Sequence, residues 1–496
     1  MRRGHCRSDD TSRGLRRVKT QTWRRALIIS LACGPVVLCF LASWQPWLTD
    51  PNTLATLIFL ELILAALWSY RSRFFPLLLG AFLCAGIMFS FSGAFRTGRW
   101  LVLAVAAAAG VIVYMKQRQL HLTVFHSLAW VCVVTALASA VVSAYPQVAV
   151  LKALSLLLLF LYGATGARLA MLGHEHAFLS SFMAGCEWVV YLAAIAYFLF
   201  EFPIFGNPNS LGAVMGVVAV PMLFWGILVN EPSPRRSRYT AALVVALILL
   251  FTSYARAGFA AAACTCVLMC LTLRRYRLLA KGVCLCLLLA AAVAAIVPQY
   301  NEPSGSLTST FLYKGKREQG IFGSRKSIWD HTVPVIREHP WLGSGFGTST
   351  TSYEDDSREL AAVQSSVQAS REHGNSYLAI TEWVGLLGDA PFLCLLLLIV
   401  LNLSRVLVWV RRSGSVSSPA VPVAMVVLAG LVHAAFEDWL FAVGYYLCVL
   451  FWTFAFILVD LVPPPFPSCV PAAQNVPRHW PGHSPALIPA RHAPVS

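Results

Sequence analysis

Charged residues are scarce in this sequence. Only 12% of its 496 residues are charged and 58% are hydrophobic, whereas an ordinary soluble domain has about 25% charged residues. A stack of soluble domains is therefore excluded. Apolar runs near or above the roughly 18 residues that cross a bilayer recur from Ala26 to Leu461, which predicts an all-α polytopic membrane protein.

Hydropathy and bilayer thickness together predict about fourteen transmembrane helices. The range is twelve to fourteen, because two of the apolar segments are short, near 100–115 and 239–254. The predicted spans are 26–44, 53–70, 74–95, 100–115, 122–144, 149–167, 178–202, 209–229, 239–254, 257–273, 279–297, 389–410, 419–436 and 438–461.

Acidic residues are much fewer than basic ones, which gives a formal net charge of +16. On a soluble protein this excess would suggest nucleic acid as a partner. Here residues 1–25 hold nine basic and two acidic residues, and basic residues are retained in the cytoplasm. If the spans alternate in direction, five strongly basic turns also lie on the cytoplasmic side. The short turn with Arg96 and Arg99 is the exception, because the same alternation places it outside. The charge therefore predicts a cytoplasmic N-terminus and no nucleic acid.

Cysteine is absent from the longest connection, residues 298–374, which the same alternation places outside the cytoplasm. Twelve of the fourteen cysteines lie in predicted spans and are interpreted as packing residues, with no metal site. A cleavage site for a signal peptide is also lacking, because Trp44-Gln45-Pro46 follows the first apolar run.

Five regions follow from these observations. They are a basic cytoplasmic tail (1–25), about eleven transmembrane helices (26–297), an external catalytic loop containing short helices (298–374), a re-entrant amphipathic segment with the last transmembrane helices (375–461), and a disordered Pro-rich tail (462–496).

Ionisable side chains within the predicted spans are few, and each is costly to place in hydrocarbon. They are Glu61, Lys152, Glu187, Arg256, Glu382, His433 and the Glu437-Asp438 pair. Arg256 lies at the external end of a span between small residues, which allow a second backbone or a ligand to approach. An interfacial arginine that extends to lipid headgroups is the alternative interpretation.

The span after 202 has a polar external entrance, Asn207-Pro208-Asn209-Ser210. Asn209 or Ser210 is expected to cap the helix, because Pro208 stops helix before it. Capping accounts for most of this motif without a ligand.

The first part of the external loop that carries a motif, from Gly323, is expected to form a helix. Ser324 is expected to cap it, Arg325 and Trp329 lie on it, and Pro334 must end or kink it.

A glycine-rich turn follows Arg337 and His339 in the same loop. It reads Trp341-Leu342-Gly343-Ser344-Gly345-Phe346-Gly347. Alternate glycines permit positive φ and leave amide hydrogens available, which predicts an anion-binding nest. No strand precedes this turn, so it is not a dinucleotide fingerprint.

The loop closes at His373-Gly374-Asn375. Nine residues separate Asn375 from Gly385, and Gly388 follows. A histidine beside a re-entering segment that carries Glu382 is a candidate base, because its ordinary pKa of about 6.5 lets it accept a proton near neutrality.

Taken in this order, the motifs resemble the O-antigen ligase and Wzy polymerase superfamily of bacterial surface-polysaccharide enzymes. The motifs are Asn207-Pro208-Asn209, the Arg256 turn, the Arg325-to-Trp329 helix, His339-Pro340 with the glycine string, and His373 to Gly388. The resemblance covers residues 200 to 395 in detail, and the layout of spans around one late loop extends it over most of the chain.

The resemblance implies a multi-pass protein of the bacterial inner membrane whose long loop is periplasmic. It implies a glycosyltransferase that uses an undecaprenyl-diphosphate-linked glycan and needs neither a cofactor nor a metal. Arg256 and Arg325 would bind the diphosphate, and His373 would activate or orient the acceptor hydroxyl. The resemblance further implies a set of substrate-binding residues, namely Asn209, Trp329, Arg337, His339, Gly345, Asn375 and Glu382.

One departure from the family pattern concerns the histidine. Ligases of the family commonly have histidine directly before the position of Asn375, where this chain has Gly374. One residue is about 100° of rotation on a helix, so His373 would point away unless Gly374 redirects the backbone. The displacement favours an O-antigen or exopolysaccharide polymerase over a lipid A core ligase.

Other functions stay open from the sequence. The acceptor could be a glycan, a lipid A core or, for a protein O-oligosaccharyltransferase, a protein. A transporter or flippase of lipid-linked substrate would instead line a path with Lys152, Glu187 and Arg256, but no internal repeat supports it.

Overall fold

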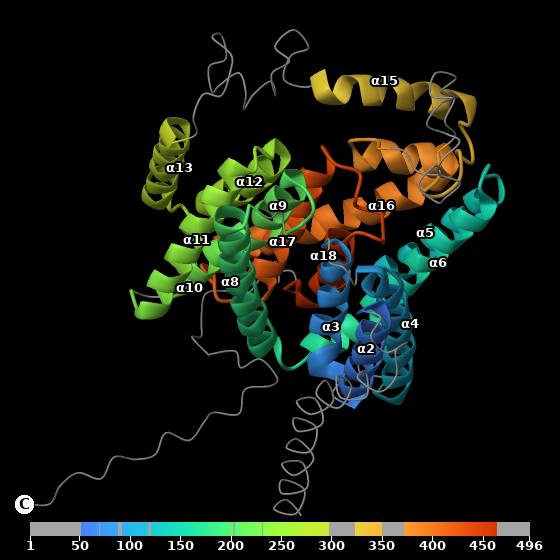
Figure 1. Ribbon diagram of the computed structural model, residues 1–496, viewed down its shortest axis with the longest axis horizontal. Helices are drawn as coiled ribbons and strands as arrows, with labels where there is room; N and C mark the ends of the chain where they lie inside the picture. The colour runs from blue at the N-terminus through green and yellow to red at the C-terminus, as the bar shows by residue number, and fades with distance from the viewer. Residues whose placement is uncertain are drawn as a thin grey trace, which may run out of the picture.

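The structure is a computed structural model that describes residues 51–68, 70–87, 92–117, 121–201, 204–230, 232–296, 323–349 and 372–463. The predicted basic tail, the first span 26–44 and most of the predicted C-terminal tail lie outside these ranges, as do residues 297–322 and 350–371 of the loop. Within the described ranges the chain forms helices and no strands (Figure 1). It is an all-α polytopic membrane protein.

The thirteen predicted spans from 53–70 onward each correspond to a helix or to a helical run that includes a π-helical turn. In chain order the elements are α2 (Pro51–Trp68), α3 (Tyr70–Ala85), α4 (Ser92–Gln117), α5 (Val124–Val141), α6 (Pro146–Tyr162), η2 (Gly163–Ala167), α7 (Arg168–Met171), α8 (Glu175–Leu199), α9 (Pro208–Val214), η3 (Met215–Ala219), α10 (Val220–Val229), α11 (Pro234–Thr252), α12 (Arg256–Thr272), α13 (Tyr276–Ile296), α15 (Gly323–Glu338), α16 (Ser376–Ser413), α17 (Ala420–Ala434) and α18 (Tyr446–Leu461).

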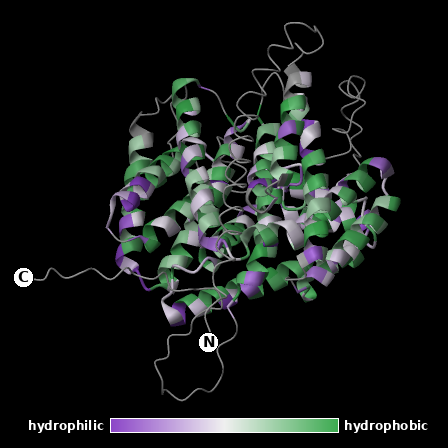
Figure 2. Ribbon diagram, turned by 90° about the horizontal axis from the view of Figure 1, so that it is seen from below, coloured by the Kyte–Doolittle hydropathy of each residue, from purple (hydrophilic) through white to green (hydrophobic). Residues whose placement is uncertain are grey.

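Six helices of the described chain are long and apolar enough to cross a membrane by themselves. They are Gly93–Lys116, Val124–Val141, Pro146–Met171, Glu175–Leu199, Pro208–Val229 and Ser376–Ser413. Five shorter apolar helices accompany them, and hydrophobic residues dominate the helices of the bundle (Figure 2). α15 lies across one end of the bundle, next to the first half of α16 (Figure 1). We call this end, with residues 204–208, 253–256, 323–349, 372–376 and 435–445, the loop face.

Two predicted boundaries were wrong, whereas the predicted start of the span 389–410 lies shortly after the break of α16 at Gly385. The span 74–95 ends earlier, because α3 stops at Ala85. The span 438–461 starts at Tyr446 instead. The apolar residues Trp439, Leu440 and Phe441 misled the hydropathy argument, because they belong to the loop between α17 and α18 and are buried inside the protein.

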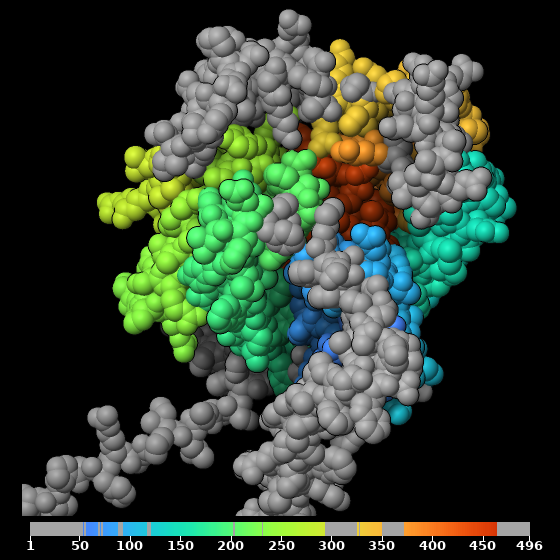
Figure 3. Space-filling model, viewed as in Figure 1, coloured from blue at the N-terminus to red at the C-terminus, as the bar shows by residue number. Residues whose placement is uncertain are grey.

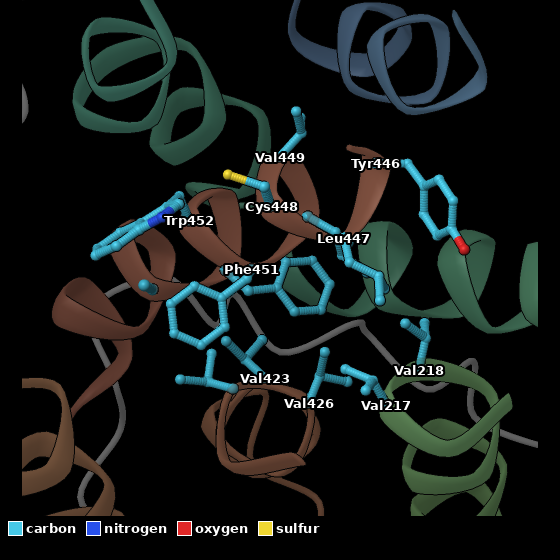
Figure 4. Close-up of a cluster of buried hydrophobic side chains, with 14 of the residues drawn as sticks. Val217, Val218, Val423, Val426, Tyr446, Leu447, Cys448, Val449, Phe451 and Trp452 are labelled. Atoms are coloured by element: carbon cyan, nitrogen blue, oxygen red, sulfur yellow. The ribbon is translucent and has the colours of Figure 1, made fainter. Parts of the chain in front are cut away.

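The core is built around α17 and α18, most of whose residues are buried. Val423 and Val426 of α17 face Phe451 of α18, and Val217 of η3 closes the cluster (Figure 4). The indole of Trp452 donates to the carbonyl oxygen of Leu440 at 2.7 Å, which ties α18 to the loop above it. The core thus fixes the loop 435–445 that contributes to the site.

Glycines bring α9 and η3 against α12. A Cβ added to Gly216 would lie 2.1 Å from the carbonyl oxygen of Gly258, and one added to Gly258 would lie 2.3 Å from that of Gly212. Such contact between backbones requires small residues at the helix interface. The small residues around Arg256 therefore serve helix packing, and they place the start of α12 beside the start of α9.

Candidate active site

α16 is interrupted near its start, and the interruption organises the loop face. Gly385 has φ 65° and ψ 178°, a conformation that is essentially restricted to glycine. The break leaves main-chain groups of Glu382, Trp383, Leu386 and Leu387 without helical partners, so other backbone groups must satisfy them.

The glycine string supplies those partners. The amides of Ser344 and Gly345 donate to the carbonyl oxygens of Glu382 and Trp383 at 2.9 and 3.1 Å. In the other direction the amides of Leu386 and Leu387 donate to the carbonyl oxygens of residues 340 and 341. Backbone hydrogen bonds in both directions therefore hold the turn against the broken helix.

The glycine string, residues 341–347, was predicted to form an anion-binding nest. The amides of Gly343, Ser344 and Gly345 donate to carbonyl oxygens of the protein, so these three are not available to an anion. The glycines do have positive φ, but close packing requires it: a Cβ on Gly345 would lie 2.2 Å from Cβ of Ser143. Gly345 contacts the end of α5 and holds the loop in place.

The backbone conformation of Gly374 determines where His373 points. It has φ +59°, and α16 begins only at Ser376, so His373 is not on the helix. Asn375 caps α16 through Oδ1, which accepts from the amides of Tyr377 and Leu378 at 2.8 and 3.1 Å. The left-handed glycine turns the chain before this cap and directs His373 into the protein.

His373 lies between two carboxylates. Its amide donates to Asp438 Oδ2 at 2.7 Å, and its Nδ1 lies 3.4 Å from the same oxygen. Its Nε2 lies 3.2 Å from Glu382 Oε1 and 3.2 Å from Ser349 Oγ. The Trp383 ring meets the imidazole edge to face at 5.4 Å between centroids. Both His373 and Glu382 are fully buried.

These carboxylates set the charge of His373. Burial disfavours the imidazolium, but the hydrogen bonds and charges of Asp438 and Glu382 outweigh it and raise the pKa of His373. The reverse holds for Asp438: burial opposes its charge, yet the contacts with His373 hold its pKa below the usual range. A proton is therefore readily held on His373, next to an ionised Asp438.

Arg325 lies over Gly374. A Cβ on Gly374 would come within 2.8 Å of Arg325 Nη1, so only glycine fits beneath the guanidinium. Nη1 donates to Glu372 Oε1 at 2.8 Å, and Nη2 pairs with Glu437. Glu372 is 64% exposed, whereas the Arg325 side chain is 16% exposed. The pair with Glu372 is thus the accessible one.

Arg256 approaches the same place from α12. It is the first residue of that helix, after a turn in which Tyr254 has φ +51°, and its positive charge is close enough to act on that of Arg325. The amide groups at a helix N-terminus also carry partial positive charge. Two interacting arginines and a helix N-terminus thus lie on the loop face, with Arg325 over Gly374 and so next to His373, an arrangement suited to a doubly charged anion.

The entrance before α9 is capped two positions before Asn209, the nearer of the two expected caps. Asn207 caps the helix, its Oδ1 accepting from the amide of Ser210 at 2.7 Å, and Pro208 is the first helical residue. Asn209 is exposed at the second position. The hydroxyls of Tyr445 and Tyr446 reach Ser210 Oγ and its carbonyl oxygen at 3.3 and 3.2 Å, so this entrance adjoins the loop 435–445.

The remaining candidates from the sequence lie around α15. Trp329 is half-buried, whereas Arg337 and His339 are exposed. α15 continues through Pro334 to Glu338, so of the two expected effects, an end or a kink, Pro334 does not end the helix. The helix also begins at Gly323, so Ser324 lies within it and does not precede it as a cap.

Sequence reasoning did not include Glu437, Asp438 and Ser349 among the site residues. The adjacent carboxylates Glu437 and Asp438 were visible as ionisable residues at a span boundary, and that was their only signal. Ser376 Oγ donates to the carbonyl oxygen of Glu437 at 2.6 Å, which fixes the pair beside the start of α16.

Lys152 and Glu187, two of the residues proposed for a transport path, are bound to other groups of the protein. Lys152 donates to the carbonyl oxygen of Gly347, and Glu187 accepts from Arg238 Nε at 2.9 Å. Arg99, from the basic turn that the alternation places outside, donates to the carbonyl oxygen of Gly444 at 2.8 Å and lies over Trp100. Among the described residues, no three His, Cys, Asp or Glu side chains are placed to hold a metal ion.

Comparison with known proteins identifies one part of the chain. Residues 241–393 match the family model described as O-antigen ligase. The matched segment runs from α11 into α16 and includes Arg256, Arg325 and His373. No curated protein matches the chain.

Proposed function

We propose, from the membership of residues 241–393 in the O-antigen ligase superfamily, that the chain is a membrane glycosyltransferase acting on undecaprenyl-diphosphate-linked glycan. It would transfer or polymerise that glycan at the periplasmic face of the bacterial inner membrane, for O-antigen or exopolysaccharide synthesis. The observation that carries this proposal is His373, which lies between Asp438 and Glu382, with Arg325 over the neighbouring Gly374 and Arg256 close enough to act on Arg325.

The chemical step that we propose is a displacement at the anomeric carbon. The acceptor hydroxyl gives its proton to His373 Nε2 in the unprotonated form, and the hydroxyl oxygen forms a bond to the anomeric carbon. The bond from that carbon to the diphosphate oxygen breaks, and its electron pair leaves with the polyprenyl diphosphate. Asp438 orients the imidazole and stabilises the imidazolium as it forms.

The leaving diphosphate gains negative charge during this step, and cations lower the energy of that charge. Arg256 and Arg325 would supply them. Because Glu372 is exposed and holds only one arm of Arg325, diphosphate oxygens can replace it on Nη1 while Glu437 keeps the guanidinium in place. We therefore assign Glu372 as the group that the donor displaces.

The same step accommodates several acceptors. A hydroxyl of a growing glycan, of a lipid A core or of a protein would each take the place beside His373. We favour a growing glycan, and hence a polymerase, because the histidine is displaced from the position common among ligases.

Complementation tests this function. A strain that lacks its own polymerase or ligase is supplied with the wild-type chain or with His373→Ala, Arg256→Ala or Arg325→Ala, and the glycan ladder is compared on gels. Lys326→Ala is the matched control, because Lys326 is exposed and adjoins Arg325 on α15.

The three variants should lose the ladder while the control keeps it, with equal amounts of each protein in the membrane. Normal ladders from all three variants would remove the catalytic assignment. The length distribution separates a polymerase, which yields a ladder of repeats, from a ligase, which attaches a finished chain.

A further inference from the structure

An apolar cavity of about 440 Å³ lies between α3 and α8, apart from the charged residues of the site. Its walls include Leu79 and Leu83 from α3, Phe178 and Val189 from α8, Val218 from η3, and Leu450 from α18. α3 and α8 lie side by side on the face shown in Figure 3. The volume is in the range of roughly 300–1,000 Å³ that is usual for ligand pockets.

The cavity is long, with its ends at different depths of the bundle. Along α8 it extends from Ala177 to Val189, and a helix rises about 1.5 Å per residue, so this wall alone is about 18 Å long. One end reaches His174, before α8 begins, and the other reaches Tyr446, at the start of α18.

Aromatic rings hold the two walls apart. Phe75 of α3 meets Phe178 and Phe182 of α8 at 5.0 and 6.0 Å between ring centroids. Phe454 of α18 lies behind them, 6.2 Å from Phe75. This cluster bridges the walls at one side and leaves the remaining length of the cavity to a ligand.

The end at Tyr446 adjoins the elements that carry the candidate active site. The Tyr446 hydroxyl donates to the carbonyl oxygen of Ser210, in the first turn of α9 (Figure 4 shows Tyr446, Leu447 and Val218). α9 packs against α12, which begins at Arg256. A molecule with its anionic head at Arg256 and Arg325 would therefore have an apolar channel within reach of its tail.

We infer that this cavity binds the hydrocarbon chain of the lipid-linked donor. An almost entirely apolar lining excludes a charged or sugar ligand, because polar groups lose their hydration there without gaining partners. The inference rests on the proposed function for the identity of the donor. It adds a second binding region, which recognises the lipid chain independently of the diphosphate.

Two glycines allow the cavity to be filled without disturbing the backbone. Gly80 of α3 and Gly185 of α8 both line it, and a Cβ on either meets no atom within 4 Å. Gly282 of α13 is the matched control, since it also has nothing within 4 Å and does not line the cavity. The variants are Gly80→Phe, Gly185→Phe and Gly282→Phe.

The test is photo-crosslinking of the full-length protein in phospholipid nanodiscs. One probe is a polyprenyl diphosphate with a photoreactive group on its chain, and the other is a phospholipid with the same group on an acyl chain. The first probe should label peptides from 75–83 and 174–189, and excess unlabelled polyprenyl diphosphate should compete. Labelling should fall about tenfold or more in Gly185→Phe and Gly80→Phe, because a phenyl group fills the apolar space the chain would bury. It should be unchanged in Gly282→Phe.

The outcomes separate the two proposals. If both probes label the cavity equally and polyprenyl diphosphate does not compete, the cavity holds bilayer lipid and this inference is wrong. If complementation yields a ladder but the prenyl probe labels elsewhere, the inference fails while the proposed function stands. If complementation yields no ladder, the proposed function fails, whatever the probes label.

Discussion

His373 and Asp438 are joined at two points: the amide of His373 donates to Asp438 Oδ2 at 2.7 Å, and the Nδ1 of the ring lies 3.4 Å from that oxygen. One carboxylate therefore fixes both the backbone and the side chain of the histidine, across 65 residues of sequence. This relationship makes Asp438 the positioning residue of the candidate site.

Asp438→Asn should lower activity and shift its pH dependence. The pKa of His373 is raised, so in wild type the unprotonated base appears only as pH rises through that raised value. Removing the charge of Asp438 lowers the pKa of His373 toward its ordinary value of about 6.5. The acid limb of kcat/KM should therefore move to lower pH, while kcat falls about 100-fold from the loss of orientation.

The pH profile distinguishes this role from a merely structural one. A variant that is misfolded loses activity at every pH without moving the limb. An unshifted limb in a folded Asp438→Asn protein, judged by its melting temperature, would contradict the assignment of His373 as the base.

Gly374→Ala should inactivate the protein by displacing Arg325. The left-handed conformation costs about 1 kcal/mol with any Cβ, and this Cβ would lie 2.8 Å from Arg325 Nη1. Gly173→Ala is the control, because Gly173 has φ +74° and nothing within 4 Å. Equal stability losses in the two variants, with activity lost only in Gly374→Ala, are the expected result in melting and transfer assays.

Glu372→Gln should improve donor binding. The Glu372 ion pair with Arg325 is largely exposed, so breaking it is worth no more than about 1 kcal/mol, or up to about fivefold in KM for the donor. Glu338→Gln, an exposed carboxylate on α15, is the control. A raised KM for the lipid-linked donor in Glu372→Gln would show that Glu372 is not displaced by the diphosphate.

Gly385→Ala should destabilise the protein more than Gly414→Ala. Both glycines have positive φ, but a Cβ on Gly385 would lie 2.4 Å from the Trp341 carbonyl carbon, while Gly414 has nothing within 4 Å. We expect a loss of about 1 kcal/mol for Gly414→Ala and at least about 3 kcal/mol for Gly385→Ala. Thermal melting in detergent checks the order, and equal losses would mean that the glycine string does not depend on this break.

Hydropathy predicted the helices because lipid contact and burial both select apolar residues, and this is also why it failed at Trp439 to Phe441. There the apolar residues face protein, within the loop 435–445 that also carries Glu437 and Asp438. The sequence placed Arg256 at the external end of a span and Asn375 at the start of a re-entrant segment. It could not reveal that Gly374 is left-handed or that Asp438 meets His373, since both depend on contacts between distant segments.

The function of the glycine string also depends on contacts with a distant segment, which the local sequence does not reveal. Its composition permits an anion nest and a docking turn alike, because both need positive φ. Only the break at Gly385 decides between them, by presenting carbonyl oxygens that take up the amides of Ser344 and Gly345. The sequence can indicate that the backbone has an unusual conformation. The groups to which that backbone hydrogen-bonds are determined by the tertiary structure.

The docked turn leaves four large apolar side chains facing outward at the loop face. Trp341, Leu342, Leu386 and Leu387 are 63%, 43%, 53% and 60% exposed. Such residues, tryptophan above all, favour the zone between lipid headgroups and hydrocarbon. They would therefore fix the depth in the membrane at which the break in α16 lies. His373, twelve residues before Gly385 along the chain, would then lie at the level of the lipid headgroups, which is also the level that a diphosphate tethered to a membrane-dissolved chain must occupy.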